Sequence, residues 1–169
     1  GNEKLARYKN IQKWTVDFDK ISLNGMKVNY FQETGMVILK NDEFYLAMSL
    51  LNRNNAHRYR GHFHNDQLSI ELWVNGNNIL TDPGSYTYTG DMDKRNEMRS
   101  AKAHNAPYFN QEPNPFMPGI MGLFHQKNNS SAKLHYLDEH RVVAELKFNN
   151  VKVIRDISIF DNYLEIVED

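Results

Sequence analysis

The sequence predicts an all-β fold, an antiparallel β-sandwich built from short strands. Apolar and polar residues alternate in several short runs, and residues that favour turns separate one run from the next. Helical periodicity is scarce by comparison. Short strands with frequent turn signals are typical of sandwiches and barrels. We therefore expect two antiparallel sheets packed face to face.

The clearest strand leads up to the turn sequence 75–78, Asn-Gly-Asn-Asn. Its apolar side chains alternate with Ser69, Glu71 and Trp73. A slip of one residue would expose all of the apolar side chains, so the register is strongly specified. The apolar residues predicted to face the core are Leu68, Ile70, Leu72 and Val74.

The same reasoning gives the remaining strands. Met36 to Lys40 and Glu43 to Leu51 form a predicted hairpin around Asn41-Asp42. Near the end of the chain, Asp161-Asn162 is a predicted turn before a strand from Tyr163 to Val167. Two further strands are predicted from alternating apolar residues, which are Val142, Ala144, Leu146 and Phe148 in one and Val151, Val153, Ile157 and Ile159 in the other.

Helices are predicted at two places only. Asn2 to Trp14 favours a short helix or an irregular lead-in, and Asp91 to Ala103 favours a helical turn. Asn110 to Gly122 contains three prolines and two glycines, which predicts an irregular surface loop. We expect residues 1–20 to be a linker or the remnant of an upstream helical domain, and residues 21–169 to form the sandwich.

The last strand, Tyr163 to Asp169, stops without a turn or a polar tail. Two interpretations follow: the chain is truncated from a longer protein, or this strand is simply the last edge of its sheet. In the first case the first and last strands would leave exposed edges. Such edges tend to pair with another chain, which predicts a homo-oligomer or an intermolecular sheet.

Composition excludes several classes of function. Lys and Arg total 20 and Asp and Glu total 21, so no global charge attracts nucleic acid or an acidic membrane surface. The apolar runs are too short to span a bilayer. Cysteine is absent, which excludes thiolate metal sites, disulfides and cysteine nucleophiles. A metal would therefore need histidine and carboxylate ligands.

Histidines concentrate in one part of the chain, where His57, His62, His64 and His104 are four of the seven in the sequence. In an extended backbone His62 and His64 would point the same way. Asp82 precedes a Pro-Gly turn, where a carboxylate can face the sheet edge. Two imidazoles and a carboxylate form a normal ligand set for Zn²⁺. Spaced histidines are more often ordinary polar residues, so spacing alone favours no metal site.

Simple hairpin geometry also places the ligands apart. If Asn75 pairs with Asn78, then Asp82 lies opposite Glu71, seven residues from His64. At about 3.3 Å per residue, this separation is too large for one metal ion. The site forms only if residues 64–67 fold back instead of extending the strand.

A longer pattern resembles a known family. The sequence is similar to the heparinase II/III-like polysaccharide lyases, in which small residues around two histidines precede a Leu-Ser-Phe-Glu-Leu strand. The matching segments are Gly61-His62-Phe63-His64-Asn65-Asp66-Gln67, Leu68-Ser69-Ile70-Glu71-Leu72-Trp73, Asn75-Gly76, Leu80 to Asp91, Arg95-Asn96, Arg99-Ser100 and Ala103-His104-Asn105.

The resemblance implies an enzymatic activity and a second domain that this activity requires. Members of the family pair an α/α toroid with a β-sandwich, and the active site lies in the cleft between them. They cleave uronic-acid-containing polysaccharides by β-elimination: the C5 carboxylate is neutralised, the C5 proton is removed and the C4 oxygen leaves. Since nothing here corresponds to the toroid, we expect the isolated chain to be inactive. The resemblance further suggests a periplasmic or secreted bacterial protein.

The resemblance also assigns roles to residues. His64, Asp82 and His104 correspond to the ligands of a structural divalent metal, most simply Zn²⁺. His62, Tyr88 and Arg99 are the implied catalytic residues, with an arginine facing the uronate carboxylate. The residues implied to contact substrate are Tyr86, Arg95 and Asn105, and the alternative role implied for Asn105 is to position a neighbouring ligand.

Two other functions fit parts of the sequence. A non-catalytic carbohydrate-binding module would predict a planar aromatic strip, such as Trp73 with Tyr86 or Tyr88, and no metal. A small metal enzyme of the cupin type would also use a His-x-His pair. That reading requires a glutamate a few residues later, and Glu71 lies seven residues beyond His64.

Overall fold

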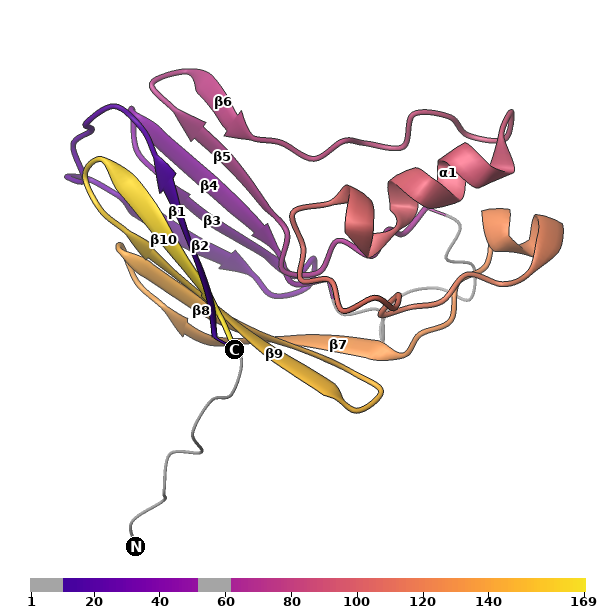
Figure 1. Cartoon of the computed structure of the whole chain (residues 1–169). Helices are drawn as coiled ribbons and strands as arrows, with labels where there is room; N and C mark the ends of the chain where they lie inside the picture. Colours follow the sequence, from indigo (N-terminus) through magenta and orange to yellow (C-terminus); the bar gives the residue numbers. More distant parts are fainter. Residues whose placement is uncertain (1–10, 52–61) are drawn as a thin grey trace, which may run out of the picture.

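Two five-stranded antiparallel sheets face each other in the computed structural model, which describes residues 11–51 and 62–169 (Figure 1). The terminal sheet has the strand order β1 (Gln12–Asp17), β10 (Tyr163–Glu168), β9 (Val151–Ile159), β8 (Arg141–Phe148) and β7 (Ser130–Leu137). The central sheet has the order β2 (Lys27–Phe31), β3 (Met36–Lys40), β4 (Phe44–Ser49), β5 (Ile70–Val74) and β6 (Asn77–Leu80). The predicted β-sandwich is confirmed.

The core lies between the sheets and follows the predicted alternation. The four residues predicted from β5 and its approach are all buried, whereas Trp73 is 40 % exposed. In β8 the predicted apolar side chains are buried as well, and they are Val142, Ala144, Leu146 and Phe148. Burial of each such large side chain stabilises the fold by about 1.5–3 kcal/mol. This gain fixes which face of each strand points inward.

The β5–β6 hairpin differs from its predicted register. Asn75 and Gly76 form a two-residue turn with φ values of +50° and +75°, the left-handed conformation that tight hairpin turns require. Val74 therefore pairs with Asn77, and the predicted pairing of Asn75 with Asn78 is wrong. A register shift follows, because Leu72 pairs with Leu80. The turn moves the chain after β6 toward the start of β5 and the shift partly reverses this, so Leu80 lies opposite Leu72, one residue nearer the start of β5 than in the predicted register.

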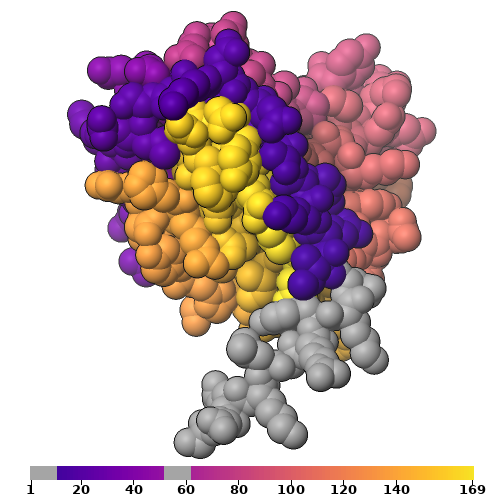
Figure 2. All heavy atoms as spheres, turned by 60° about the vertical axis from the view of Figure 1, so that its left-hand side comes forward, coloured from indigo at the N-terminus to yellow at the C-terminus, as the bar shows by residue number. Residues whose placement is uncertain are grey.

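Strand β1 belongs to the sandwich, although it lies within the range 1–20 that was expected to be a linker. It pairs antiparallel with β10 along its whole length, as seen in Figure 2, where the indigo strand lies along the yellow one. Trp14 is part of this strand, so the predicted helix does not extend to that residue. Residues 2–10 of that prediction lie outside the described part of the chain.

The last strand is internal and not an edge. β10 pairs with β9 on one side and with β1 on the other, so the expected exposed edge at the end of the chain is wrong. The edge strands are β1 and β7 in the terminal sheet and β2 and β6 in the central sheet. Association of copies through these edge strands stays a prediction.

A small helical layer extends from one end of the sandwich (Figure 1). It contains α1 (Met92–Arg99) and the 3₁₀ helices η2 (Ala101–Ala103) and η3 (Gly119–Leu123), so the predicted helical turn is confirmed. α1 starts where the Asp91 side chain accepts a hydrogen bond from Lys94 N at 2.9 Å. None of the described helices has the length and apolar character needed to cross a membrane.

The segment predicted as a surface loop is only partly exposed. It includes η3, and Pro113 and Asn114 within it are buried. Asn114 is 0 % exposed, and its side chain bonds Asn65, Gln67 and Ser130. Proline content correctly predicts irregular backbone here. It does not reveal that this backbone packs inside the protein, because the polar partners come from distant parts of the chain.

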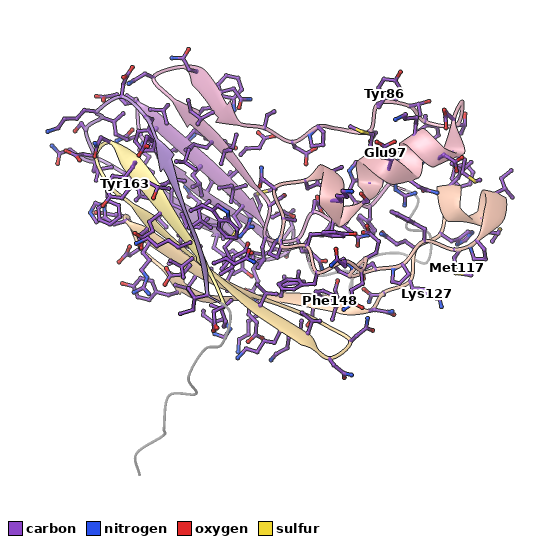
Figure 3. All side chains as sticks on the ribbon, in the orientation of Figure 1. Tyr86, Glu97, Met117, Lys127, Phe148 and Tyr163 are labelled. Atoms are coloured by element: carbon purple, nitrogen blue, oxygen red, sulfur yellow. The ribbon has the colours of Figure 1, made fainter. Side chains whose placement is uncertain are left out.

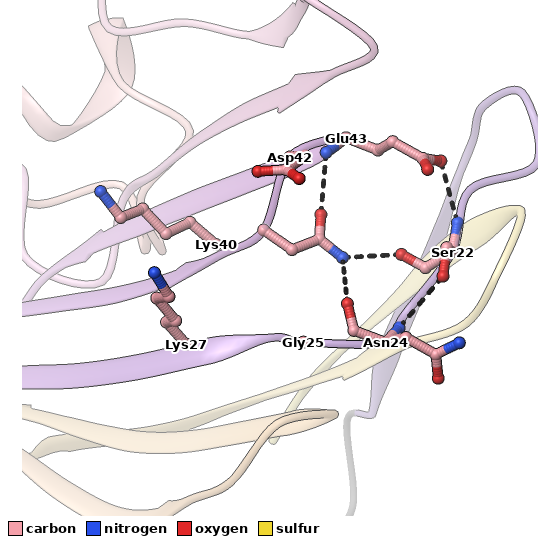
Figure 4. A pocket seen from close by; sticks show the side chains of 8 residues that line it. Ser22, Asn24, Gly25, Lys27, Lys40, Asp42 and Glu43 are labelled. Carbon is pink, nitrogen blue, oxygen red and sulfur yellow. Dashed lines mark hydrogen bonds between the residues drawn. The ribbon is translucent and has the colours of Figure 1, made fainter.

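A pocket at the other end of the sandwich contains none of the predicted site residues (Figure 4). It lies at the β3–β4 turn, where the Asn41 side chain donates to Ser22 O at 2.7 Å. A hydrogen bond from Asn75 N to Glu43 O joins this turn to the β5–β6 turn. The pocket is therefore separated from the histidines by the length of β5.

Candidate functional site

Three of the predicted residues meet at the start of β5. One potential ligand atom from each of His64, Asp82 and His104 lies within 4.8 Å of the other two. His104 Nδ1 is 2.6 Å from Asp82 Oδ2, and the centroids of the two imidazole rings are 5.3 Å apart. The structure thus brings together the three residues that the family resemblance assigned to a metal.

The backbone folds back after His64, as the site requires. Ser69 N donates to Asp66 O at 2.9 Å, and Leu68 has a φ of +65°, which turns the chain before β5 begins. A left-handed leucine is uncommon and is held by its surroundings. On the other side, Gly84 N donates to Asp82 Oδ1 at 2.8 Å and orients the carboxylate. Because residues 64–67 turn back instead of extending β5, the separation predicted for an extended strand does not arise.

The local environment fits a divalent cation. The His104 side chain is completely buried, and its Nε2 has no hydrogen-bond partner among the described residues. A buried polar atom without a partner costs about 1–3 kcal/mol, a cost that a bound cation would remove. Asp82 would either bind the cation directly or orient His104 through Nδ1, as carboxylates do in many metal sites. His64 Nε2 is 3.1 Å from Ser85 Oγ, a contact that a cation would replace or supplement.

Protonation states in the cluster also suit a cation. Burial, together with repulsion from His104, lowers the pKa of His64 from 6.5 to about 4. The hydrogen bond with His104 lowers the pKa of the Asp82 carboxyl. At neutral pH His64 is therefore neutral, with a lone pair available, and Asp82 is ionised. Metal ligands must be in these states, because protons compete with the metal.

The low pKa of His64 predicts a pH-dependent stability in the presence of a chelator. Between pH 6.5 and about 4 the unfolded chain binds a proton at His64 that the folded protein does not bind. Stability therefore rises with pH in this window and is lost as the pH falls through it. His64→Gln removes the titrating group. The urea unfolding midpoint of this variant should therefore fall less than that of wild type when the pH is lowered from about 7 to about 5, a range that includes the ordinary histidine pKa. Equal losses for both proteins would contradict the burial of a neutral His64.

His62 and Tyr88 form a second, exposed pair. Tyr88 Oη is 3.2 Å from His62 Nε2, and the ring centroids are 5.4 Å apart. Tyr88 is 52 % exposed, so both rings are open to a ligand from solvent. Arg95 holds Tyr88 through two contacts. Its guanidinium lies 4.6 Å from the Tyr88 ring centroid, and its Nη1 donates a hydrogen bond to Tyr88 O at 2.7 Å. The pair is the candidate acid–base group of the site.

The two arginines do not lie where the resemblance placed them. Arg95, expected to contact substrate, is 2 % exposed, and Arg99, expected in catalysis, is 0 % exposed. Arg99 donates from Nε to Phe63 O at 3.0 Å and from Nη1 to Gly122 O at 3.0 Å, and burial lowers its pKa to about 10. A guanidinium held by backbone carbonyls in the interior cannot face a uronate carboxylate. Both arginines hold the site in place.

The remaining two substrate candidates differ from one another. Tyr86 is 81 % exposed with a φ of +58°, and it lies on the outer rim of the helical layer (Figure 3). Asn105 instead uses its side chain on the β5 backbone: it accepts from Ile70 N at 2.7 Å and donates to Ile70 O at 2.8 Å. Asn105 therefore anchors the segment that carries His104 to β5, which does not fit direct contact with substrate.

Sequence reasoning missed the residues that join the segment around His64 (residues 62–68) to the segment around His104 (residues 99–105). These are the two histidine segments. Asn65 N donates to Arg99 O at 2.9 Å, which ties the two segments directly. Arg155, from β9, donates from Nη1 to Leu68 O and to Asn105 O, each at 2.6 Å. A charged residue inside an otherwise alternating strand is the signal that could have identified Arg155. Glu112 bonds both segments as well, and no pattern in the sequence marks it.

Known proteins similar to this chain share its fold and sequence pattern. The family model "Heparinase II/III-like, C-terminal" matches residues 24–117, which include the histidine cluster. The heparin-sulfate lyase of Bacteroides stercoris is 29 % identical over 112 residues, covering 64 % of this chain but only 16 % of the relative. This chain therefore spans a small part of the length of that enzyme.

Two solved structures show the same fold. The crystal structure of heparinase III superposes with a TM-score of 0.58 at 23 % identity, covering 78 % of this chain and 20 % of that one. The heparinase III-BT4657 gene product gives a TM-score of 0.59 at 23 % identity, covering 87 % of this chain and 22 % of that one. With the family model matching more than half of its residues, the chain belongs to the heparinase II/III-like C-terminal family.

Proposed function

We propose that this chain is the β-sandwich part of a polysaccharide lyase that acts on a uronic-acid-containing polysaccharide by β-elimination. The observation that carries the proposal is the hydrogen-bonded pair His62 and Tyr88, exposed to solvent two residues from the His64 ligand candidate. The similarity to a heparin-sulfate lyase supports the substrate class. Such a polyanion does not cross a bilayer, so we also propose a periplasmic or secreted location.

The pair suits the proton transfers of this reaction. In β-elimination a base takes the C5 proton, the C5–H electrons form the C4–C5 double bond, and the C4–O bond breaks with protonation of the leaving oxygen. Tyr88 and His62 share one hydrogen bond, so one can accept a proton while the other donates. Because Arg95 and Arg99 are buried, we assign neutralisation of the C5 carboxylate to groups outside this chain, most simply those of the missing α/α toroid.

We further propose that His64, Asp82 and His104 hold one divalent cation, with Zn²⁺ the best match to the donor set. A bound cation would fix these three side chains and add positive charge near the site. Its role in this proposal is structural: it holds the backbone that presents His62. The buried Nε2 of His104, which has no partner among the described residues, is the observation that supports it.

The alternative, a non-catalytic carbohydrate-binding module, receives less support. It requires Trp73 to share a flat aromatic surface with Tyr86 or Tyr88. Trp73 instead lies one residue from the β5–β6 turn, paired with Asn78, whereas the Tyr88 ring contacts His62 and the edge of Phe124. The aromatic side chains thus gather around a titratable group, which favours catalysis over passive binding.

The test uses the full-length protein that contains this chain, since the fragment is expected to lack half of the active site. Heparan sulfate and other uronate polymers are incubated with the enzyme, and the unsaturated product is followed by its ultraviolet absorbance. His62→Ala and Tyr88→Phe should each lower kcat by about 10²-fold or more, the usual contribution of a general acid–base group. Trp73→Ala serves as the control for the alternative, and it should leave kcat unchanged.

Two outcomes would contradict this proposal. Wild-type activity in His62→Ala would remove the pair from the chemistry. Binding of the polymer without any unsaturated product, together with loss of that binding in Trp73→Ala, would favour the carbohydrate-binding module.

A further inference from the structure

The two histidine segments of the site are held together by a carboxylate from a third segment. Glu112 lies in the irregular stretch between η2 and η3 and is partly buried. Its Oε2 accepts a hydrogen bond from Asn65 Nδ2 at 2.6 Å and another from Ala101 N at 2.9 Å. Asn65 is the residue after His64, and Ala101 begins the 3₁₀ helix η2, which ends at Ala103, immediately before His104.

We propose that Glu112 is a positioning residue that sets the distance between His64 and His104 and thereby the affinity of the cluster for a divalent cation. This inference rests on the proposed metal site. Glu112 acts through the Asn65 side chain and the Ala101 backbone, because the same oxygen bonds the neighbour of one ligand and the start of the helix that precedes the other. Charge-assisted bonds of this kind are about twice as strong as neutral ones.

The surroundings of Glu112 make it a rigid anchor. Two residues later, Asn114 is 0 % exposed and bonds the Asn65 side chain, with Asn114 N donating to Asn65 Oδ1 at 3.0 Å. Asn114 Nδ2 also donates to Ser130 Oγ at 2.6 Å, which connects this segment to the start of β7. The segment 112–114 is thus fixed to the terminal sheet, and from this fixed position Glu112 bonds both histidine segments.

The geometry of the two bonds selects the variants. Both bonds end on the same oxygen, so Glu112→Gln can keep both if its amide oxygen occupies that position. Glu112→Ala removes both bonds and leaves the Asn65 amide and Ala101 N without this acceptor. Glu112→Asp is one methylene shorter and cannot reach both donors. Glu97→Ala is the matched control, because it removes an exposed carboxylate of α1 that bonds Lys94 and neither of the two donors of Glu112.

The first measurement is the affinity of the chain for Zn²⁺, and for Co²⁺ as a spectroscopic probe. Loss of a partner behind metal ligands typically lowers affinity about 10- to 100-fold, and we expect about 10-fold for Glu112→Ala because other bonds also join the segments. Glu112→Gln and Glu97→Ala should remain within about twofold of wild type. If Glu112→Ala does not fold, Glu112→Asp decides the question, with an expected affinity below that of wild type.

The second measurement does not depend on a metal. In a chelator, amide hydrogen exchange of residues 62–67 and 101–105 should be faster in Glu112→Ala than in wild type, with β8 unchanged. Failure of wild type to bind Zn²⁺ or Co²⁺ would overturn the proposed metal site. Unchanged affinity and unchanged exchange in Glu112→Ala would overturn the positioning role of Glu112. An equal loss of affinity in Glu112→Gln and Glu112→Ala would show that charge near the site, and not the two bonds, governs binding.

Discussion

His64→Ala is expected to abolish uptake of Zn²⁺ by the chain. Removal of this ligand leaves Asp82 and His104, which already bond each other at 2.6 Å, and two side chains rarely hold Zn²⁺ in a structural site. A cation that binds only the folded state stabilises it by about 2.7 kcal/mol at 100 times its Kd. Wild type should therefore melt at a higher temperature with Zn²⁺ than with a chelator. The variant should melt at the same temperature in both.

The control for this experiment is His62→Ala. His62 lies two residues away, is exposed, and bonds Tyr88 and not the cluster. This variant should bind Zn²⁺ like wild type, with stoichiometry measured by metal analysis after dialysis. Metal bound at full stoichiometry by His64→Ala would mean that His64 is no ligand. Loss of metal in His62→Ala alone would exchange the roles of the two histidines.

The strands could be predicted because they are stabilised by burial of apolar side chains at alternate positions, a pattern that is visible in the local sequence. Leu68 to Val74 and Val142 to Phe148 each place an apolar side chain inward at every second position, and burial of these side chains sets the register. The pairing of β10 with β1 could not be predicted in this way. It joins residues at the two ends of the chain, and nothing in either strand specifies its partner.

The convergence of the site depended on features that alternation does not contain. The left-handed Leu68 and the hydrogen bond from Ser69 N to Asp66 O turn the chain back, so that His64 lies near Asp82, whereas an extended strand would keep the ligands apart. Such local distortions are stabilised by distant partners, here the carbonyl bond from Arg155 to Leu68. The family resemblance identified the cluster because it preserves the outcome of these contacts without showing the contacts themselves.

The arginines show the opposite case. Arg95 and Arg99 lie four residues apart in a polar helix, a pattern that equally fits a solvated surface or a substrate-binding face. In the structure both are buried, because backbone carbonyls of Phe63, Tyr88 and Gly122 need donors in the interior. Polar residues on a helix predict a polar environment, and whether solvent or the protein backbone provides it depends on tertiary packing.

The buried ion pair between Arg155 and Glu168 should be the most sensitive point for stability. Both side chains are at least nine-tenths buried, and Arg155 Nε donates to Glu168 Oε1 at 2.7 Å. Arg155 also holds the carbonyls of Leu68 and Asn105, one in each histidine segment. Glu168→Ala would leave a buried guanidinium without its carboxylate. Removal of one partner from a buried pair costs about 3–5 kcal/mol, a large share of the 5–15 kcal/mol typical of a folded domain.

Urea unfolding of the metal-free chain measures this loss, and a neighbouring pair provides the control. Arg141 and Asp156 form a more exposed ion pair in which Arg141 Nη2 lies 2.5 Å from Asp156 Oδ2, so Asp156→Ala should cost less than about 1 kcal/mol. The double variant Arg155→Met with Glu168→Met should remain destabilised, although paired apolar replacements are often neutral. Its Leu68 and Asn105 carbonyls lose their donor, and buried acceptors without partners are costly. A double variant as stable as wild type would show that these two carbonyl bonds contribute nothing to stability. A loss below about 1 kcal/mol in Glu168→Ala would show that the buried ion pair contributes no more than an exposed one.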